Sequence, residues 1–147
     1  MIESADYLVY KHFGKLLADP HVEILDPATG TGTFIVRLLQ SGLIQSKDLA
    51  RKYQSELHAN EIVLLAYYIA AVNIEAAYHG AFKKGNYQPF HGMVLTDTFQ
   101  LSEDKGYLKG WKDTMLPENS ERAKKQNQHA IQVIIGNPPY SEGQSEN

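Results

Sequence analysis

Cysteine is absent from the sequence, and its six histidines are scattered along the chain. A chain without cysteine has no disulfide, no thiolate zinc site and no cysteine nucleophile. The histidines show no HxxxH or similar ligand spacing, so we expect no metal site. No hydrophobic run approaches the roughly 20 residues of a membrane span, and the N-terminal residues lack the order of a signal peptide. We therefore expect a cytoplasmic protein without a membrane partner.

Positive charge is also scarce, because 14 Lys and Arg stand against 17 Asp and Glu, for a formal net charge of −3. A protein that binds nucleic acid by itself needs a surplus of basic residues on some face. We expect this chain alone to bind DNA weakly or not at all. Its 147 residues, 43% of them hydrophobic and 21% charged, are typical of one globular domain or part of one.

Short apolar runs alternate with stretches of helical periodicity along the chain. Strands are expected at residues 22–26, 52–60, 93–96 and 131–135. Helices are expected at residues 3–18, at 33–42, from 61 to a C-cap at Gly80, and within 117–128. Alternating strands and helices indicate parallel βαβ units. We therefore predict an α/β fold with a doubly wound sheet of about four parallel strands, fewer than such sheets usually have.

Ligands of open parallel sheets bind at the carboxyl ends of the strands. The segments that follow the four expected strands are Asp26–Gly32, Glu61, Asp97 and Asn137–Tyr140. Each contains glycine, carboxylate, amide or aromatic groups suited to binding. The sequence therefore predicts a ligand site at this edge of the sheet.

The first of these segments opens the stretch DPATGTGTF, which leads into a helix. Gly30 and Gly32 permit a sharp bend and a close approach of the backbone to a ligand. Ile35 stands where a dinucleotide fingerprint needs a third Gly or Ala, and the Gly-Lys-Ser/Thr of a P-loop is absent. Asp26 instead suits a positively charged ligand, such as the ammonium group of an amino acid. The alternative is an ordinary tight turn between strand and helix.

Two further carboxylates are candidates for binding a nucleoside. Glu61 could accept hydrogen bonds from both ribose hydroxyls, or could be a first-turn helix residue favoured by the helix dipole. Glu56 competes with it, but is expected in mid-strand and facing away from the apolar side. Asp97 could receive an adenine amino group, or could be an N-cap or Asx-turn residue.

The tetrapeptide Asn137-Pro138-Pro139-Tyr140 follows the last expected strand. Its prolines fix the backbone and remove two N–H groups, so a stiff loop presents carbonyl oxygens, an amide and an aromatic ring. The Asn137 side-chain oxygen and the Pro138 carbonyl oxygen could accept both hydrogens of an exocyclic amino group and free its lone pair to attack. Tyr140 could stack on a flipped base. The alternative is an Asn-Pro turn.

With DPATGTGTF, Glu61, Asp97 and NPPY in this order, the chain resembles the adenine-N6 DNA methyltransferases, which use S-adenosylmethionine. The stretches ILDPATGTGTFIVRLLQSGLI, ELHANEIVLLAYYIAAVNIE and ENSERAKKQNQHAIQVIIGNPPYSEGQS are similar to the methyltransferase region of type ISP single-chain restriction-modification enzymes. The cofactor loop precedes the catalytic loop, as in the gamma arrangement of these enzymes. The resemblance implies a Rossmann-like class I methyltransferase sheet.

The resemblance also implies roles for particular residues. Cofactor binding falls on Asp26, Pro27, Ala28, Thr29, Gly30, Thr31, Gly32, Phe34, Glu61 and Asp97, with Glu61 at the ribose and Asp97 at the adenine. Catalysis falls on Asn137, Pro138, Pro139 and Tyr140. The implied reaction transfers a methyl group from S-adenosylmethionine to the amino group of a flipped adenine in DNA, with S-adenosylhomocysteine as product.

The resemblance is incomplete at both ends of the chain. A Thr-Pro-containing element upstream of the family's first helix has no counterpart, and neither have the last strands and the target-recognition domain. We therefore expect residues 1–147 to be part of a methyltransferase catalytic domain, inactive alone and bound to DNA in the full-length enzyme. Open alternatives are an amino-methyltransferase of RNA or protein glutamine, which shares NPPY, and a cofactor-binding module without activity. A nicotinamide oxidoreductase fits less well.

Overall fold

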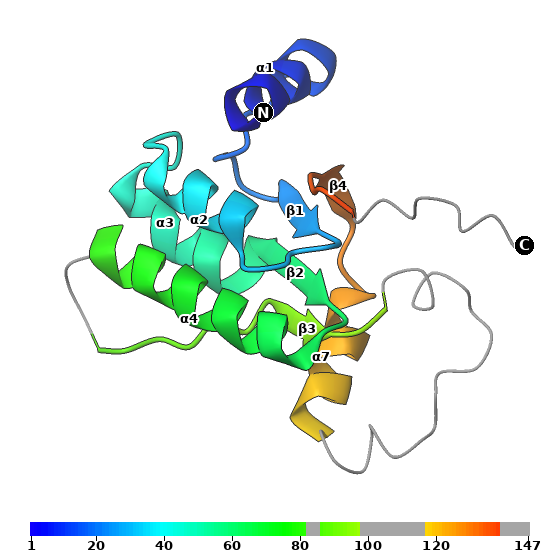
Figure 1. Ribbon diagram of the computed structural model, residues 1–147. Helices are drawn as coiled ribbons and strands as arrows, with labels where there is room; N and C mark the ends of the chain where they lie inside the picture. Colours follow the sequence, from blue (N-terminus) through cyan, green and yellow to red (C-terminus); the bar gives the residue numbers. More distant parts are fainter. Residues whose placement is uncertain (82–85, 98–116, 139–147) are drawn as a thin grey trace, which may run out of the picture.

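The computed structural model describes residues 1–81, 86–97 and 117–138 (Figure 1). The elements in these ranges are α1 (Ile2–Phe13), β1 (Glu23–Asp26), α2 (Thr33–Gln40), α3 (Ser46–Arg51), the π-helical turn η1 (Lys52–Glu56), β2 (Leu57–Glu61), α4 (Leu64–Ala81), β3 (Met93–Leu95), α7 (Pro117–Gln126) and β4 (Ile131–Ile134). Within them, no helix combines the length and the hydrophobicity that crossing a membrane requires.

The strands of the described ranges form one parallel sheet in the order β3-β2-β1-β4. Its register pairs Ile24 with both Leu57 and Val133, and Ala59 with Met93. This confirms the predicted α/β class with four parallel strands. The chain adds β2 and β3 on one side of β1 and then returns to add β4 on the other side. The direction of strand addition therefore reverses between β1 and β4.

Helices cover both faces of this sheet. Ile24 and Leu57 belong to the main hydrophobic core, into which α2 and α4 pack side by side. Successive strand side chains point to opposite faces, so Leu25 and His58 lie on the other face. That face is covered by α7, which contacts β3 and shares a groove with His58. A right-handed crossover explains the change of face, because the connection into β4 runs opposite to the earlier ones.

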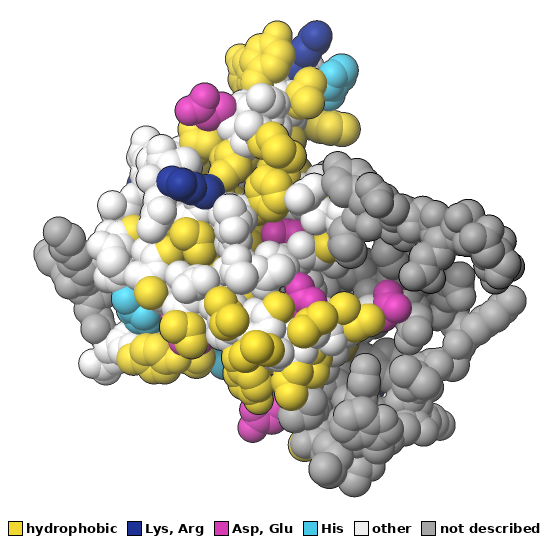
Figure 2. Space-filling view, viewed as in Figure 1, with side chains coloured by type: hydrophobic (Ala, Val, Ile, Leu, Met, Phe, Trp, Pro, Cys, Tyr) yellow, Lys and Arg dark blue, Asp and Glu magenta, His cyan; other side chains and the backbone are white. Residues whose placement is uncertain are grey.

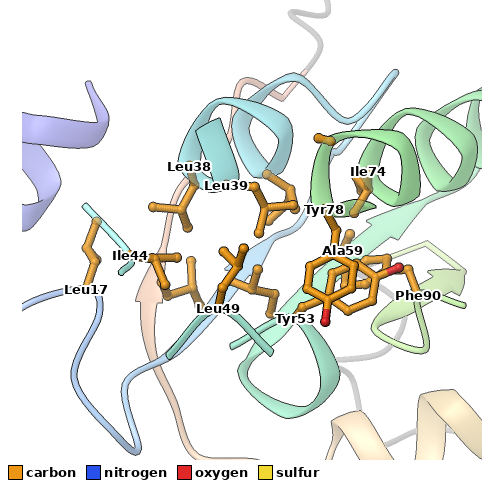
Figure 3. Packing of buried hydrophobic residues seen from close by; sticks show 14 of the residues in the cluster. Leu17, Leu38, Leu39, Ile44, Leu49, Tyr53, Ala59, Ile74, Tyr78 and Phe90 are labelled. Carbon is orange, nitrogen blue, oxygen red and sulfur yellow. The ribbon is translucent and has the colours of Figure 1, made fainter. Parts of the chain in front are cut away.

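Aromatic rings lie at one end of the core between the sheet and its helices, beside aliphatic side chains such as Leu39 and Leu49 (Figure 3). The rings of Tyr53 and Tyr78 stack with centroids 3.7 Å apart and planes 6° from parallel. The Tyr53 hydroxyl donates a hydrogen bond to the carbonyl oxygen of Gln88, which satisfies its buried polar end. The side of α4 that faces solvent also carries hydrophobic residues. Leu65 and Val72 are among the exposed hydrophobic side chains there (Figure 2).

The first helix is shorter than the sequence pattern predicted. The apolar spacing suggested a helix over residues 3–18, whereas α1 ends at Phe13. Gly14 adopts the left-handed conformation with φ 66°, and its N–H donates to the carbonyl oxygen of Tyr10. Glycine in this conformation is a common helix C-cap, and the prediction overlooked it. Gly80, expected to cap the long helix, lies inside α4 instead.

The prediction of a strand over residues 52–60 was wrong for its first five residues. Its first part is the π-helical turn η1, and β2 begins only at Leu57. The cause is a buried ion pair, because Lys52 Nζ lies 2.9 Å from Glu56 Oε2 and also donates to the carbonyl oxygens of Asp19 and Val22. Glu56 was expected on a strand facing away from the apolar side. It is buried instead and bonds to Lys52 and Arg51.

Substitution of Gly92 tests the close approach that precedes β3. A Cβ atom there would overlap the carbonyl oxygen of Leu57, and the Gly92 carbonyl oxygen must still accept from the Ala59 N–H at 2.9 Å. We expect Gly92→Ala to lower the free energy of unfolding by at least about 2 kcal/mol in urea denaturation. Gly80→Ala, where no atom lies within 4 Å, should raise it by up to about 1 kcal/mol. Equal effects of the two substitutions would contradict this packing.

Candidate ligand site at the carboxyl edge of the sheet

The direction of strand addition reverses between β1 and β4, and ligands of open α/β sheets bind at the carboxyl ends of the strands at such a point. Asp26 is the last residue of β1, and Gly136 and Asn137 follow β4. A Cβ atom on Gly136 would lie 2.9 Å from Asp26 Oδ1 and 3.0 Å from Pro27 Cδ. The loops after β1 and β4 are therefore in contact, and only glycine fits where they meet.

The loop after β1 is a tight turn in which side chains and backbone of the same loop are hydrogen-bonded to each other. The Thr29 hydroxyl donates to the carbonyl oxygen of Asp26 at 2.9 Å, and the Ala28 N–H donates to Asp26 Oδ1 at 3.3 Å. Gly30 and Gly32 have φ angles of 56° and 87°, which explains why glycine is required at both positions. A Cβ on Gly32 would also lie 3.1 Å from the Ile74 side chain of α4. The loop and α2 therefore pack closely against α4.

Glu61 joins this loop to α4. Its Oε2 accepts a hydrogen bond from the Gly30 N–H, and its Oε1 accepts from the N–H groups of Ile62 and Val63, each at 2.8 Å. Glu61 is therefore the last residue of β2, as predicted, and it also bonds to the backbone that leads into α4. The alternative, a residue in the first turn of the helix, is wrong, because α4 begins only at Leu64. A carboxylate has about four acceptor positions, so three bonds leave room for another donor.

The carboxyl group of Asp26 is the most unusual feature of the site. Its side chain is 0% exposed, and Oδ2 has no hydrogen-bond partner among the described residues. Burial raises the pKa of Asp26 from its ordinary value of 3.8 to about 6, the Ala28 N–H opposes the rise, and the Glu61 charge adds to it. Such an unsatisfied buried acceptor would gain most from a cationic or hydrogen-bond-donating ligand.

Of the other predicted site residues, Thr31, Phe34, Asp97, Asn137 and Pro138 belong to the described ranges. Thr31 is exposed and its carbonyl oxygen accepts from Asn73 Nδ2, while Phe34 is half-buried in the first turn of α2. Asp97 follows Thr96, whose N–H donates to the Glu61 carbonyl oxygen at 2.8 Å. Asn137 and Pro138 are exposed. Pro139 and Tyr140 lie outside the described residues.

Sequence reasoning missed three contributors to the site. Asn73 of α4 holds the loop at Thr31, and the Thr29 N–H donates to the Asn60 carbonyl oxygen at 2.9 Å. Gly136 was not singled out either, although it is the contact between the two loops. A glycine immediately before NPPY was the available signal for Gly136. No sequence pattern identifies Asn73, which lies 42 residues from its partner.

Three solved structures are similar to the chain over 98% of its length, each with a TM-score of 0.87. One is a nuclease-deletion mutant of the Type ISP restriction-modification enzyme LlaGI in complex with a DNA substrate mimic, 51% identical. The others are the DrdV–DNA complex and the ATP-dependent Type ISP restriction-modification enzyme LlaBIII bound to DNA, both 49% identical. The chain spans only 12%, 13% and 10% of these three chains, respectively.

No model of a protein family matches the chain, and no curated protein does. Identity near 50% over almost the whole chain, together with the same fold, supports a restriction-modification context for this protein.

The buried carboxyl group of Asp26 makes stability depend on pH in a defined direction. Because the pKa is raised to about 6 in the folded protein, the folded state binds a proton more readily than the unfolded chain between pH 3.8 and 6. The Asp26 contribution therefore falls as pH rises through this window, by up to about 3 kcal/mol. Asp26→Asn removes that contribution.

Unfolding in urea at pH 4 and pH 7.5 measures the effect as a difference between wild type and Asp26→Asn. The difference cancels other titrating groups, such as His58, whose pKa is lowered by burial. We expect wild type to lose stability relative to Asp26→Asn on going to pH 7.5. The same change in both proteins would show that the carboxylate is not buried as described.

Proposed function

We propose that this chain is the cofactor-binding and catalytic-loop part of an adenine-N6 DNA methyltransferase that uses S-adenosylmethionine. The proposal includes a Rossmann-like class I methyltransferase sheet. The observation that carries it is the contact between the two loops at the strand reversal, where the buried carboxyl group of Asp26 meets Gly136, the residue before Asn137. The loop proposed to bind the cofactor and the loop that begins the proposed catalytic motif are thus in contact.

The residues around Asp26 fit S-adenosylmethionine. This cofactor carries an ammonium group and a sulfonium ion, and its sulfonium supplies an electrophilic methyl group. Asp26 Oδ2 lacks a partner among the described residues, so a cationic donor would favour its ionised form. No described side chain caps the N-terminus of α2. The loop residues Pro27, Ala28, Thr29, Gly30, Thr31, Gly32 and Phe34 would form the wall of the cofactor site.

The nucleoside half of the cofactor would lie toward β2 and β3. Glu61 would accept a ribose hydroxyl with its remaining acceptor position, while still holding the Gly30 N–H. Asp97 follows directly on Thr96, which is tied to Glu61, and would receive the adenine amino group. These assignments give each carboxylate at the sheet edge a distinct part of one ligand.

Asn137 and Pro138 would prepare the substrate amino group for attack. The lone pair of an exocyclic amino group is delocalised into the adenine ring, so the nitrogen is a poor nucleophile. The Asn137 side-chain oxygen and the Pro138 carbonyl oxygen would accept its two hydrogens and localise that lone pair. The nitrogen would then bond to the methyl carbon as the carbon–sulfur bond breaks, and one amino proton would pass to water. Placement of the two groups is the main source of acceleration.

Pro139 and Tyr140 complete the proposed catalytic loop as predictions from the sequence. Pro139 would stiffen the loop, and Tyr140 would stack on the flipped base, an interaction worth about 1 to 3 kcal/mol. Both residues lie outside the described part of the structure, so these assignments rest on the sequence.

DNA would be bound mainly by other parts of a longer protein. The chain is acidic overall, with a net charge of −3, and spans at most 13% of each solved relative. Those relatives are complexes with DNA or with a DNA mimic. We infer that the chain contributes methylation chemistry to a restriction-modification enzyme of this kind and has little activity alone.

Transfer of labelled methyl groups tests the proposal in a longer protein that contains this chain. Label from S-adenosylmethionine should appear at adenine N6 of DNA. Asn137→Ala should reduce the transfer rate at least about 100-fold while leaving the cofactor dissociation constant unchanged. The matched control is Asn127→Ala, an exposed asparagine in the turn after α7, which should leave both quantities unchanged.

The destination of the label separates the alternatives. Label in RNA or in protein glutamine, with none in DNA, would favour another amino-methyltransferase. Absence of transfer to all three substrates, with cofactor binding intact, would favour a binding module. If Asn137→Ala abolished cofactor binding together with transfer, Asn137 would belong to the cofactor site instead.

A further inference from the structure

A second cluster of polar side chains lies at the opposite end of the sheet, and the proposed function does not use it. Glu23 is the first residue of β1, His58 is the second residue of β2, and His129 lies in the turn between α7 and β4. Three segments far apart in the sequence thus meet at the amino ends of three neighbouring strands. Asp26, by contrast, is at the carboxyl end of β1.

The ligand atoms of this cluster converge on one point. His58 Nε2 lies 2.7 Å from Glu23 Oε2, and His129 Nδ1 lies 3.3 Å from Glu23 Oε1. One ligand atom from each residue falls within 4.8 Å of the other two. Donor atoms around a tetrahedral zinc ion with bonds of about 2.0 to 2.1 Å are about 3.3 Å apart. Small side-chain rotations would therefore suffice to accommodate an ion between the three groups.

The surroundings supply access and a further polar group. His58 and His129 line a groove of about 370 Å³ under α7, so water can reach the cluster from one side. Gln126 of α7 lines the same groove and is 7% exposed, yet its Nε2 has no hydrogen-bond partner among the described residues. A buried donor without an acceptor is rare, and a water or anion held in the groove would satisfy it.

The chemical nature of the three ligands selects a class of ion. Two imidazoles and one carboxylate suit Zn²⁺, whereas Mg²⁺ and Ca²⁺ prefer oxygen ligands alone. The nearby guanidinium of Arg122 is already engaged by the Met93 carbonyl oxygen and the Tyr67 hydroxyl. Glu23 supplies the single negative charge of the ligand set, and its backbone N–H donates to Gln132 Oε1, which fixes the residue in place.

We propose that Glu23, His58 and His129 form a binding site for a zinc ion that joins β1, β2 and the turn before β4. A water molecule in the groove, which Gln126 also lines, would complete the coordination. The expectation of no metal site was based on ligand spacing along the chain. That spacing carries no information here, because parallel pairing of β1 and β2 brings together residues 35 positions apart.

Metal titration of the 147-residue chain tests this site directly. Metal-free protein is titrated with Co²⁺, whose visible absorption reports the ligand geometry, and then with Zn²⁺ by calorimetry. We expect one equivalent of zinc to bind, with displacement of cobalt, and the melting temperature to rise with zinc. Cobalt bound with the intense absorption of tetrahedral coordination would support the assigned ligand set.

Two histidine variants locate the ion. His129→Asn, in the turn after α7, should weaken zinc binding at least tenfold. His91→Asn removes an exposed histidine of the same groove that is outside the cluster, and should leave the affinity unchanged. Circular dichroism checks that each variant is folded. If His129→Asn is unfolded, the titration of the wild-type protein alone tests whether the chain binds zinc.

Three results would overturn the proposal. Wild-type protein that shows no saturable binding at about 1 mM zinc would mean that the cluster is only a hydrogen-bonded group between strands. Equal affinity of wild type and His129→Asn would place the ion elsewhere. A greater loss in His91→Asn than in His129→Asn would do the same.

Discussion

The site depends on one carboxyl group that the fold holds where a charge is unfavourable. Asp26 ends the central strand β1, with β2 on one side and β4 on the other, so its side chain is enclosed at the reversal of the sheet. Burial without a partner for Oδ2 raises its pKa to about 6. The tight loop after β1, which Glu61 binds at Gly30, lies on one side of this group, and Gly136 contacts it. A cationic ligand would relieve the unfavourable charge, which links the architecture of the sheet to the proposed cofactor.

The sheet could be predicted because its strands are short apolar runs, each followed by a turn or a helical pattern. Four strands, their parallel arrangement and the helix at residues 117–126 all followed from that alternation. The errors have physical causes. Gly14 ended α1 through a left-handed cap, and the buried pair of Lys52 and Glu56 replaced half of a strand with η1. The first cause is local and was available in the sequence, because glycine is a common helix C-cap. The second depends on the tertiary contacts of Lys52 with Asp19 and Val22, which periodicity does not report.

The sequence predicted where the candidate ligand site lies, at the carboxyl edge of the sheet, but not the contacts that support it. The rule that ligands bind where parallel strands end selected Asp26, Glu61 and Asn137, and these residues do lie at that edge. Their cofactor and catalytic roles stay predictions. The support from Asn73 and the contact at Gly136 depend on how α4 and the loops pack. The amino edge was missed entirely, because the cluster of Glu23, His58 and His129 exists only after the strands pair.

Calorimetric titration of the 147-residue chain with S-adenosylmethionine at pH 7.5 tests the central claim most directly. The account predicts saturable binding to wild type, binding weakened at least tenfold in Asp26→Ala, and no binding of NAD. Asp48→Ala, which removes a carboxylate of α3 that pairs with Arg51, should bind as wild type does. Equal affinity of wild type and Asp26→Ala, or preference for NAD, would contradict the assignment of the carboxyl edge as the site of this cofactor.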